Sequence, residues 1–162
     1  MEEITISLIA SAIIGLFCVP FLLNSMNQKK KSKSLINTLK TKTQTGGLTN
    51  GQFETWRSNY CLGLDKERKK VLFLEKENGQ DFIQTIDLAQ VKICKALLGY
   101  RSFKGEKSQQ KIIEKVQLAF MPINDSKASQ FLELYTESKQ DYLVNEWEIA
   151  QKWESEINKL LN

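Results

Sequence analysis

The strongest hydrophobic pattern in the chain is an uninterrupted run near its N-terminus. Residues 4–23 hold no charged side chain over 20 consecutive positions. A helix of that length rises about 30 Å, which matches the hydrocarbon core of a bilayer. The residues before the run are acidic, and the run is longer than the apolar part of a signal peptide. The pattern predicts a transmembrane anchor over residues 1–23, with an atypical cleaved signal or a buried helix as alternatives.

From residue 52 the pattern changes to short runs of β-branched and aromatic residues with polar turns between them. Such runs are typical of antiparallel strands. The expected strands cover residues 60–64, 71–74, 82–86, 91–100, 112–123 and 130–136. Between the second and third runs stands Asn78-Gly79, the dipeptide most typical of a two-residue β-hairpin turn.

The run at 112–123 predicts a sheet with one buried face. Its alternation places Ile112, Val116, Leu118 and Phe120 on the buried side and the neighbouring lysines on the other. Pro122 is expected to end the strand or to lie at an edge, because proline cannot donate to a ladder.

The last segment of the chain changes to a helical period. Apolar residues return there at spacings of three and four, which is the signature of an amphipathic helix of about eighteen residues. The stripe consists of Leu143, Trp147, Ala150, Trp153, Ile157 and Leu160. We expect this face to be buried in the fold, with an exposed partner-binding stripe as the alternative.

Charge separates the chain into unequal parts. There are 23 Lys and Arg against 19 Asp and Glu, but six of the lysines lie within residues 24–45, and residues 46–162 hold 17 of each sign. Residues 24–51 are rich in Ser, Thr, Asn, Lys and Gly and predict a basic juxtamembrane linker. Leu35, Ile36 and Leu39 recur there at helical spacing, so a short amphipathic helix on the inner leaflet is an alternative, as is a frayed continuation of the anchor.

The lysines directly after the apolar run predict the orientation of the anchor. Positive flanking charge stays on the cytoplasmic side and meets anionic lipid there. The expectation is a single-pass protein of the cell (inner) membrane, with its N-terminus outside and a cytoplasmic domain over residues 52–162. The lysines expected at the membrane interface are Lys29, Lys30, Lys31 and Lys33.

Small residues and cysteines add two minor expectations. Ser7, Ser11 and Gly15 recur every four residues, so this stripe could pair two anchors into a homodimer. Lipid-facing neutrality is the alternative. The three cysteines, Cys18, Cys61 and Cys94, show no CxxC spacing and are expected to be small buried hydrophobes in a reducing compartment.

The order of the predicted elements resembles that of bacterial pleckstrin-homology-like (PH-like) domain proteins. The resemblance covers residues 52–161 and rests on six to seven antiparallel strands, the two N-terminal hairpins, the segment QTIDLAQVKIC at 84–94 and the terminal helix with its tryptophans. It implies an α+β, mainly β, fold in which a bent antiparallel sheet forms a partly open barrel capped by the helix. Trp147 or Trp153 would be the family's helix tryptophan. Lipid-binding members hold inositol phosphates with bases in the first hairpin, whereas here Asp65 and Glu67 stand among the bases of DKERKK.

The residues available for catalysis are few. The chain has no histidine, which excludes Ser-His and Cys-His nucleophile pairs and every imidazole ligand. No phosphate-binding glycine loop or metal-ligand cluster is found, so we predict no catalytic residue, no cofactor and no metal. The electrically balanced domain also lacks the basic groove that nucleic acid requires.

One hairpin is the best candidate for contacting a ligand. The segment RSFKGEKSQQK combines an aromatic residue with several bases and a single acid. It could contact anionic headgroups or an acidic partner, and an ordinary surface loop is the alternative. The candidate binding residues are Arg101, Phe103, Lys104 and Lys107.

The sequence thus favours a non-catalytic, membrane-anchored interaction or scaffold module that presents its domain to a protein partner. A peripheral anionic-lipid sensor is the first alternative. An enzyme that works without histidine is the second.

Overall fold

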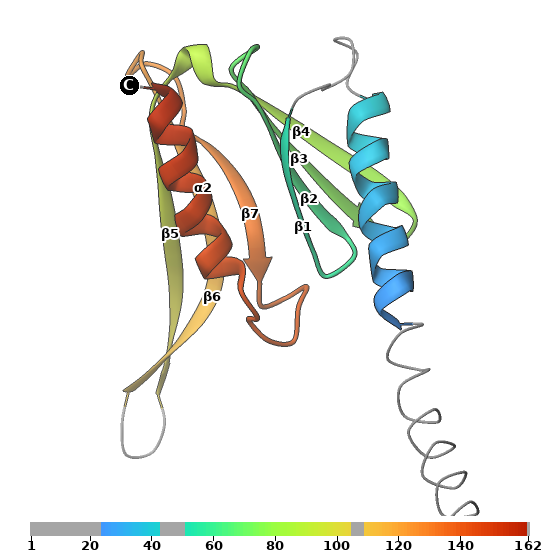
Figure 1. The fold of residues 1–162 in the computed structure, drawn as a ribbon. Coiled ribbons are helices and arrows are strands. Elements are labelled where there is room, and N and C mark those ends of the chain that lie inside the picture. The colour runs from blue at the N-terminus through green and yellow to red at the C-terminus, as the bar shows by residue number, and fades with distance from the viewer. Residues whose placement is uncertain (1–23, 43–50, 105–108, 162) are drawn as a thin grey trace, which may run out of the picture.

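The computed structural model describes residues 24–42, 51–104 and 109–161. Within them the protein is α+β: an N-terminal helix, seven antiparallel strands in two open sheets and a C-terminal helix (Figure 1). Residues 24–42 form the first helix, called the 24–42 helix below. The other elements are β1 (Gln52–Trp56), β2 (Tyr60–Asp65), β3 (Lys70–Glu77), β4 (Gln80–Asp87), η1 (Leu88–Gln90), β5 (Val91–Lys104), β6 (Gln109–Pro122), β7 (Gln130–Thr136) and α2 (Glu146–Leu161).

The two sheets are simple antiparallel meanders. The first has the strand order β1-β2-β3-β4 and the second β5-β6-β7, with η1 as the corner between them. The predicted turn at Asn78-Gly79 is confirmed, since both residues have positive φ angles, 51° and 79°. A two-residue turn with this backbone matches the right-handed twist of its strands. The six strands expected from the sequence are all present, and β1 is a further one.

A bulge corrects the predicted face of β6. Gly99 pairs with Lys115 but Tyr100 pairs with Ile113, so one residue of β6 is left over between them. The alternation shifts by one at that point. Val116, Leu118 and Phe120 are buried as expected, but Ile113 packs on the core and Ile112 is exposed. The strand ends at Pro122, as predicted.

The main core lies between the two sheets and α2. Trp153 is completely buried there, and its indole N–H donates to Glu54 Oε2 at 2.5 Å. Trp147 packs against the same core but is only partly buried. The apolar stripe predicted on the C-terminal segment is therefore core, and α2 begins at Glu146, a little later than the sequence pattern indicated.

Side chains of α2 also cover the free edge of β5. The Asn158 amide accepts from the Cys94 N–H and donates to the Cys94 carbonyl, both at 2.9 Å. Glu154 Oε2 accepts from the Ala96 N–H at 3.1 Å. The helix thus satisfies backbone groups that would otherwise form an open sheet edge.

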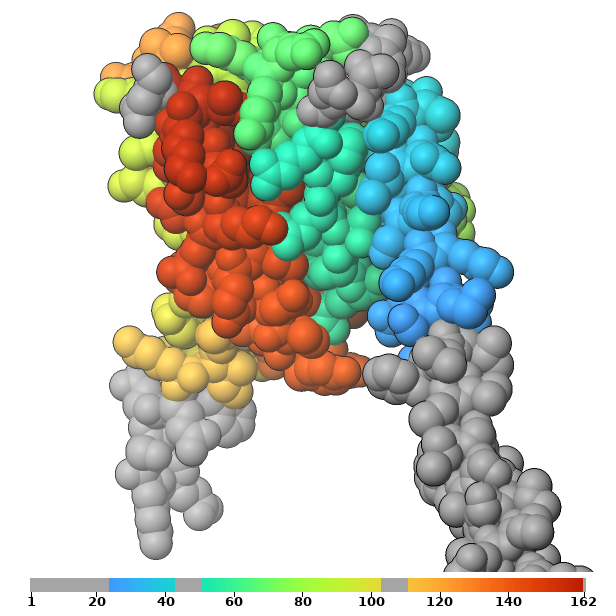
Figure 2. Space-filling model, in the orientation of Figure 1, coloured from blue at the N-terminus to red at the C-terminus, as the bar shows by residue number. Residues whose placement is uncertain are grey.

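Residues 24–42 of the predicted juxtamembrane linker form a helix that packs on the body, and residues 43–50 lie outside the described part. Leu35 and Leu39 are buried in a second cluster with Cys61, Leu72 and Leu74, on the outer face of the β1–β4 sheet. Figures 1 and 2 show the helix lying along this sheet, on the side away from α2. The composition argument failed because three apolar residues at helical spacing suffice when a sheet offers them an apolar face.

Several predictions fall on residues outside the described part. They are the anchor over residues 4–23, the stripe Ser7, Ser11 and Gly15, and Cys18. In the described residues, no helix is both long enough and apolar enough to cross a membrane.

Candidate interaction surface

The residues that the sequence singled out for binding lie in two places. Arg101 is exposed on β5, and its guanidinium donates to Glu137 Oε1 at 2.9 Å. Phe103 and Lys104 belong to the far end of β5, where only the backbone is described, and Lys107 lies outside the described residues. The structure therefore places one of the four side chains, and that one already has an acidic partner.

The lysines predicted at the membrane interface lie in the N-terminal half of the 24–42 helix. Lys29, Lys30, Lys31 and Lys33 are all exposed. The apolar residues of the same helix face the sheet instead of solvent, so the helix is amphipathic with the sheet as its apolar partner. The alternative of a helix lying with its apolar side in the inner leaflet does not fit this packing.

A surface that the sequence analysis missed is the outside of the second sheet, called the outer β5–β7 face below. In β5–β7 the inward positions join the main core, and the alternate positions point away from it. These outward positions are Ile93, Lys95, Leu97, Gln117, Ala119, Met121, Phe131 and Glu133. Five of the eight are apolar.

The outer β5–β7 face is open in the described part of the chain. Leu97 and Phe131 are among the exposed large hydrophobic residues, and Ile93 and Met121 are half-buried. Neither hydrophobic cluster of the described residues includes any of these four. The corresponding face of the first sheet is covered by the 24–42 helix, so the two sheets differ in this respect.

The outer β5–β7 face carries apolar side chains beside charges of both signs. Ala119 lies at its centre between Lys95 and Phe131 as cross-strand neighbours. Its small methyl group is buried by the larger side chains around it. At the margin, the Gln117 amide donates to Glu133 Oε1 at 2.9 Å. An apolar centre with a polar margin is the usual anatomy of a protein–protein contact.

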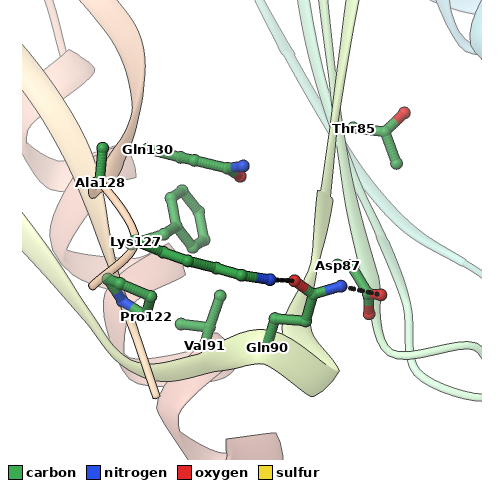
Figure 3. Close-up of a pocket in the computed structure, with 9 residues that line it drawn as sticks. Thr85, Asp87, Gln90, Val91, Pro122, Lys127, Ala128 and Gln130 are labelled. Atoms are coloured by element: carbon green, nitrogen blue, oxygen red, sulfur yellow. Dashed lines mark hydrogen bonds between the residues drawn. The ribbon is translucent and has the colours of Figure 1, made fainter. Parts of the chain in front are cut away.

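A small pocket opens at the seam between the two sheets, on the inner side of the second sheet. It is lined by residues of β4, η1, β5, β6, the β6–β7 loop and β7 (Figure 3). Lys127 reaches across it and donates to Gln90 Oε1 at 2.8 Å, and Gln90 in turn donates to Asp87 at 3.4 Å. Gln84 of β4 closes the seam further on by donating to the Phe131 carbonyl at 3.2 Å.

The size of the pocket limits what it can hold. Its volume is about 140 Å³, whereas sites for drug-sized ligands and cofactors usually measure about 300–1,000 Å³. Three of the polar residues that line it, Lys127, Gln90 and Asp87, already bond to one another. It can take a few waters or one inserted side chain, and none of the residues of the outer β5–β7 face lines it.

The described residues also offer little reactive chemistry. No group of three Cys, Asp or Glu side chains among them is arranged to hold a metal ion. Burial raises the pKa of the Cys61 thiol to about 12. The Cys94 thiol has a pKa of about 12 as well, because of burial first and the Glu154 carboxylate second. Both thiols are therefore neutral and unreactive at neutral pH.

A buried ion pair, which no sequence pattern indicated, holds the loop between β7 and α2. Arg57, in the β1–β2 turn, donates to Glu146 Oε1 and to the Tyr142 carbonyl. Glu146 is fully buried, and its other oxygen accepts from the N–H groups of Val144 and Asn145 at 2.7 and 3.2 Å. No local pattern links residue 57 with residue 146, so only the folded chain could reveal the pair.

The outer β5–β7 face did have a signal in the sequence. The segment VKICKALLGY is apolar at positions of both parities, which indicates a strand with two apolar faces. The same holds for YCLGL and VLFL, and there the second face is the one that the 24–42 helix covers.

No protein-family model, curated protein or solved structure matches the chain. Its function is therefore argued from the arrangement of its own residues.

Proposed function

We propose that this chain is a single-pass membrane protein whose cytoplasmic body binds a protein partner and performs no chemistry of its own. The observation that carries the proposal is the outer β5–β7 face. It presents Leu97 and Phe131 to solvent, whereas the equivalent face of the other sheet is covered by the chain's own helix. Exposed apolar surface of this kind marks protein contacts.

The fold class proposed for the body is PH-like. A four-stranded and a three-stranded antiparallel meander followed by a C-terminal helix supports this assignment. So does the position of Trp153, which α2 carries into the core between the sheets. A PH-like body usually serves as a binding platform, which agrees with a role that needs no catalytic residue.

The chemistry of the face describes the partner. An apolar strip bordered by Lys95 on β5 and Glu133 on β7 fits a partner segment that presents an apolar side with charges of both signs beside it. The large residue at the edge is Phe131, on the outermost strand, and it is 44% exposed. Aromatic residues in such positions often dominate binding energy.

The partner can be tested by capture of the full-length protein from its own membranes after cross-linking. The proposal expects a stoichiometric partner that is lost with Phe131→Ser. The matched control is Ile123→Ser, which changes another exposed hydrophobic residue outside the face. Equal recovery with both variants, or recovery of nothing above background with the unchanged chain, would argue against a protein-binding face.

The membrane anchor is tested separately. Residues 4–23 hold no charge over 20 positions, and they directly precede the described part of the chain. Alkaline carbonate washing should leave the chain in the membrane pellet. Protease added to intact cells should spare the body, since the lysines of residues 29–33 favour a cytoplasmic position for it. Release by carbonate, or digestion of the body from outside, would contradict the proposal.

A further inference from the structure

The 24–42 helix contacts the body at several positions along its length, so it cannot act as a free tether. Its buried leucines pack on the β1–β4 sheet. Near its middle, Thr55 Oγ1 donates to Ser32 Oγ at 2.9 Å, and near its end Lys42 binds Asp81 at 2.8 Å. The direction in which the chain leaves the body towards residue 23 is therefore set by the fold.

The start of the 24–42 helix lies at one particular end of the body, called the hairpin end below. Figure 1 shows at this same end the β1–β2 turn, the loop between β7 and α2, and the far ends of β5 and β6. Figure 2 shows them there in the same view. Contacts agree with the picture, because Arg57 of the turn binds the loop and Arg101 of β5 binds Glu137 just after β7.

The hairpin end gathers exposed apolar side chains. The structure has nine exposed large hydrophobic residues in its described part, and five belong to segments of this end. These five are Met26, Tyr100, Ile112, Tyr142 and Val144. At the opposite end, the loop after β6 contributes Ile123.

Among the described residues of the hairpin end, the exposed charges outside ion pairs are mostly positive. Lys29, Lys30 and Lys31 are exposed on the first turns of the helix, and Lys111 is exposed on β6. Several acids of this region are already paired: Glu137 with Arg101, and Glu75 and Glu77 with Lys139. Glu114 on β6 and Asp141 in the β7–α2 loop are exposed and offset part of the positive charge.

We propose that the hairpin end rests on the anionic inner leaflet, so that the body is held at the membrane by the described ends of β5 and β6, around Tyr100 and Ile112, and by the β7–α2 loop as well as by the anchor. The proposal rests on the proposed membrane anchoring. It adds an orientation and a second attachment. Exposed tyrosine, aliphatic and lysine side chains on one surface match the composition of the bilayer interface, and lysines near an anionic leaflet are attracted to it.

The orientation also leaves the proposed partner site free. The outer β5–β7 face lies along the side of the body, on the half of the sheet nearer the loop after β6. A body standing on its hairpin end presents this side to the cytoplasm.

The test places a fluorescent reporter at matched positions of the full chain in nanodiscs. The chain carries Cys18→Ser, and its two other thiols are buried and neutral, so an added cysteine is labelled selectively. The reporter sites are Ile112→Cys and Val144→Cys at the hairpin end, with Ile123→Cys as the control at the opposite end. All three replace exposed aliphatic residues.

In nanodiscs with phosphatidylglycerol, an environment-sensitive dye at residues 112 and 144 should be blue-shifted and protected from iodide quenching, whereas the dye at residue 123 should be neither. Nanodiscs of phosphatidylcholine alone should give weaker protection. Lys111→Glu should reduce the protection at residue 144, and Lys92→Glu, an exposed lysine near the other end of the β5–β6 hairpin, should not.

Equal quenching at residues 112, 144 and 123 would overturn the proposal, and so would protection that ignores lipid charge and Lys111. Protection that appears only when a protein partner is added would assign the hairpin end to that partner instead. A chain that carbonate releases from membranes would overturn the anchoring itself. A chain that stays integral with no protection at residues 112 and 144 would overturn only this inference.

Discussion

The guanidinium of Arg57 joins segments that are far apart in the chain. Arg57 lies in the β1–β2 turn, where its backbone is left-handed with a φ of 49°. Its guanidinium binds Glu146, the first residue of α2, and the Tyr142 carbonyl in the loop before it. It also lies 5.4 Å from the centre of the Tyr142 ring. The next residue, Ser58, has a positive φ of 58° as well, so this backbone belongs to the β1–β2 turn, and the turn directs the Arg57 side chain to the buried carboxylate of Glu146.

Removing Arg57 should therefore cost much more than removing another paired arginine. Arg57→Ala leaves the Glu146 carboxylate buried without its counter-charge, which typically costs about 3–5 kcal/mol. Arg101→Ala is the control, because its partner Glu137 keeps a side chain that is 32% exposed and can be hydrated. That change should cost at most about 1 kcal/mol. Urea unfolding of the full chain in detergent, followed by circular dichroism, measures both, and equal losses would contradict the account.

The two tryptophans of α2 should likewise differ in how much they contribute to the free energy of unfolding. Trp153 is fully buried and donates to Glu54, whereas Trp147 is partly exposed. Trp153→Ala should lower the free energy of unfolding by about 3–5 kcal/mol. Trp147→Ala should lower it by less than half as much, since less area returns to water. The sequence pattern placed both tryptophans on one buried stripe, so the same unfolding assay decides between pattern and packing.

Among the elements, the 24–42 helix depends most on its surroundings. Its close approach to the sheet leaves little room for a side chain at Gly63. A Cβ added at Gly63 would lie 3.1 Å from Leu39 Cδ2 and from the Phe53 ring. Underneath the helix lies Cys61, which is buried in the same cluster. The thiol therefore reports whether the helix is in place.

We expect Leu35→Ser with Leu39→Ser, or Gly63→Val alone, to release the helix and expose Cys61 to maleimide. Cys94 provides the internal control, because it lies in the main core beneath α2 and should stay protected. Labelling followed by peptide mass spectrometry distinguishes the two cysteines. Equal labelling of both would mean that the variants unfold the whole body. No labelling of either would mean that the helix does not shield Cys61.

The strands were the part of the fold most accessible to sequence analysis. A turn such as Asn78-Gly79 and a strand such as β7 follow from residues next to one another, and both were predicted. The face of β6 was predicted wrongly at Ile112 because one extra residue shifts the alternation, and the bulge depends on pairing with Gly99. A Cβ at Gly99 would lie 2.6 Å from Lys115 Cγ, so the close pairing there uses a glycine.

For the molecule as a whole, the buried thiols predict a limit on stability at alkaline pH. Cys61 and Cys94 have pKa values of about 12 in the folded chain, and 9.0 is the ordinary value expected when it is unfolded. Because only the unfolded state ionises between these values, it gains stability as pH rises. The contribution of the two thiols to the free energy of unfolding is thus complete below pH 9 and is lost as the pH rises from 9 to 12.

The expected slope is about 1.4 kcal/mol per pH unit for each thiol in that window. Burial also raises the pKa of Tyr60, which adds to the loss in the same direction. Urea titrations at pH 8, about 9.5 and about 10.5 measure the slope. The control chain carries Cys61→Ala and Cys94→Ala and should show a clearly flatter dependence. An unchanged slope in the control would assign the alkaline loss to tyrosines and lysines instead.

The candidate binding surfaces show how far the sequence could go. It singled out the β5–β6 hairpin from its own residues, and Arg101 does lie exposed there, although Glu137 binds it. It did not find the outer β5–β7 face, because that face combines residues from three strands separated by up to about forty positions. It also could not bring residues 24–31 to the same end as the hairpin, since that depends on the docking of Leu35 and Leu39.

The sequence alone determined the properties that are local or compositional. These are the uncharged run at 4–23, most of the strand and turn positions, the helical period that buries Trp153 and the absence of histidine. Tertiary structure alone decided which apolar faces are covered, where Arg57 finds its partner and which segments share the hairpin end. The physical reason is that side-chain periodicity is a local property, whereas burial and charge pairing depend on which distant segments come into contact.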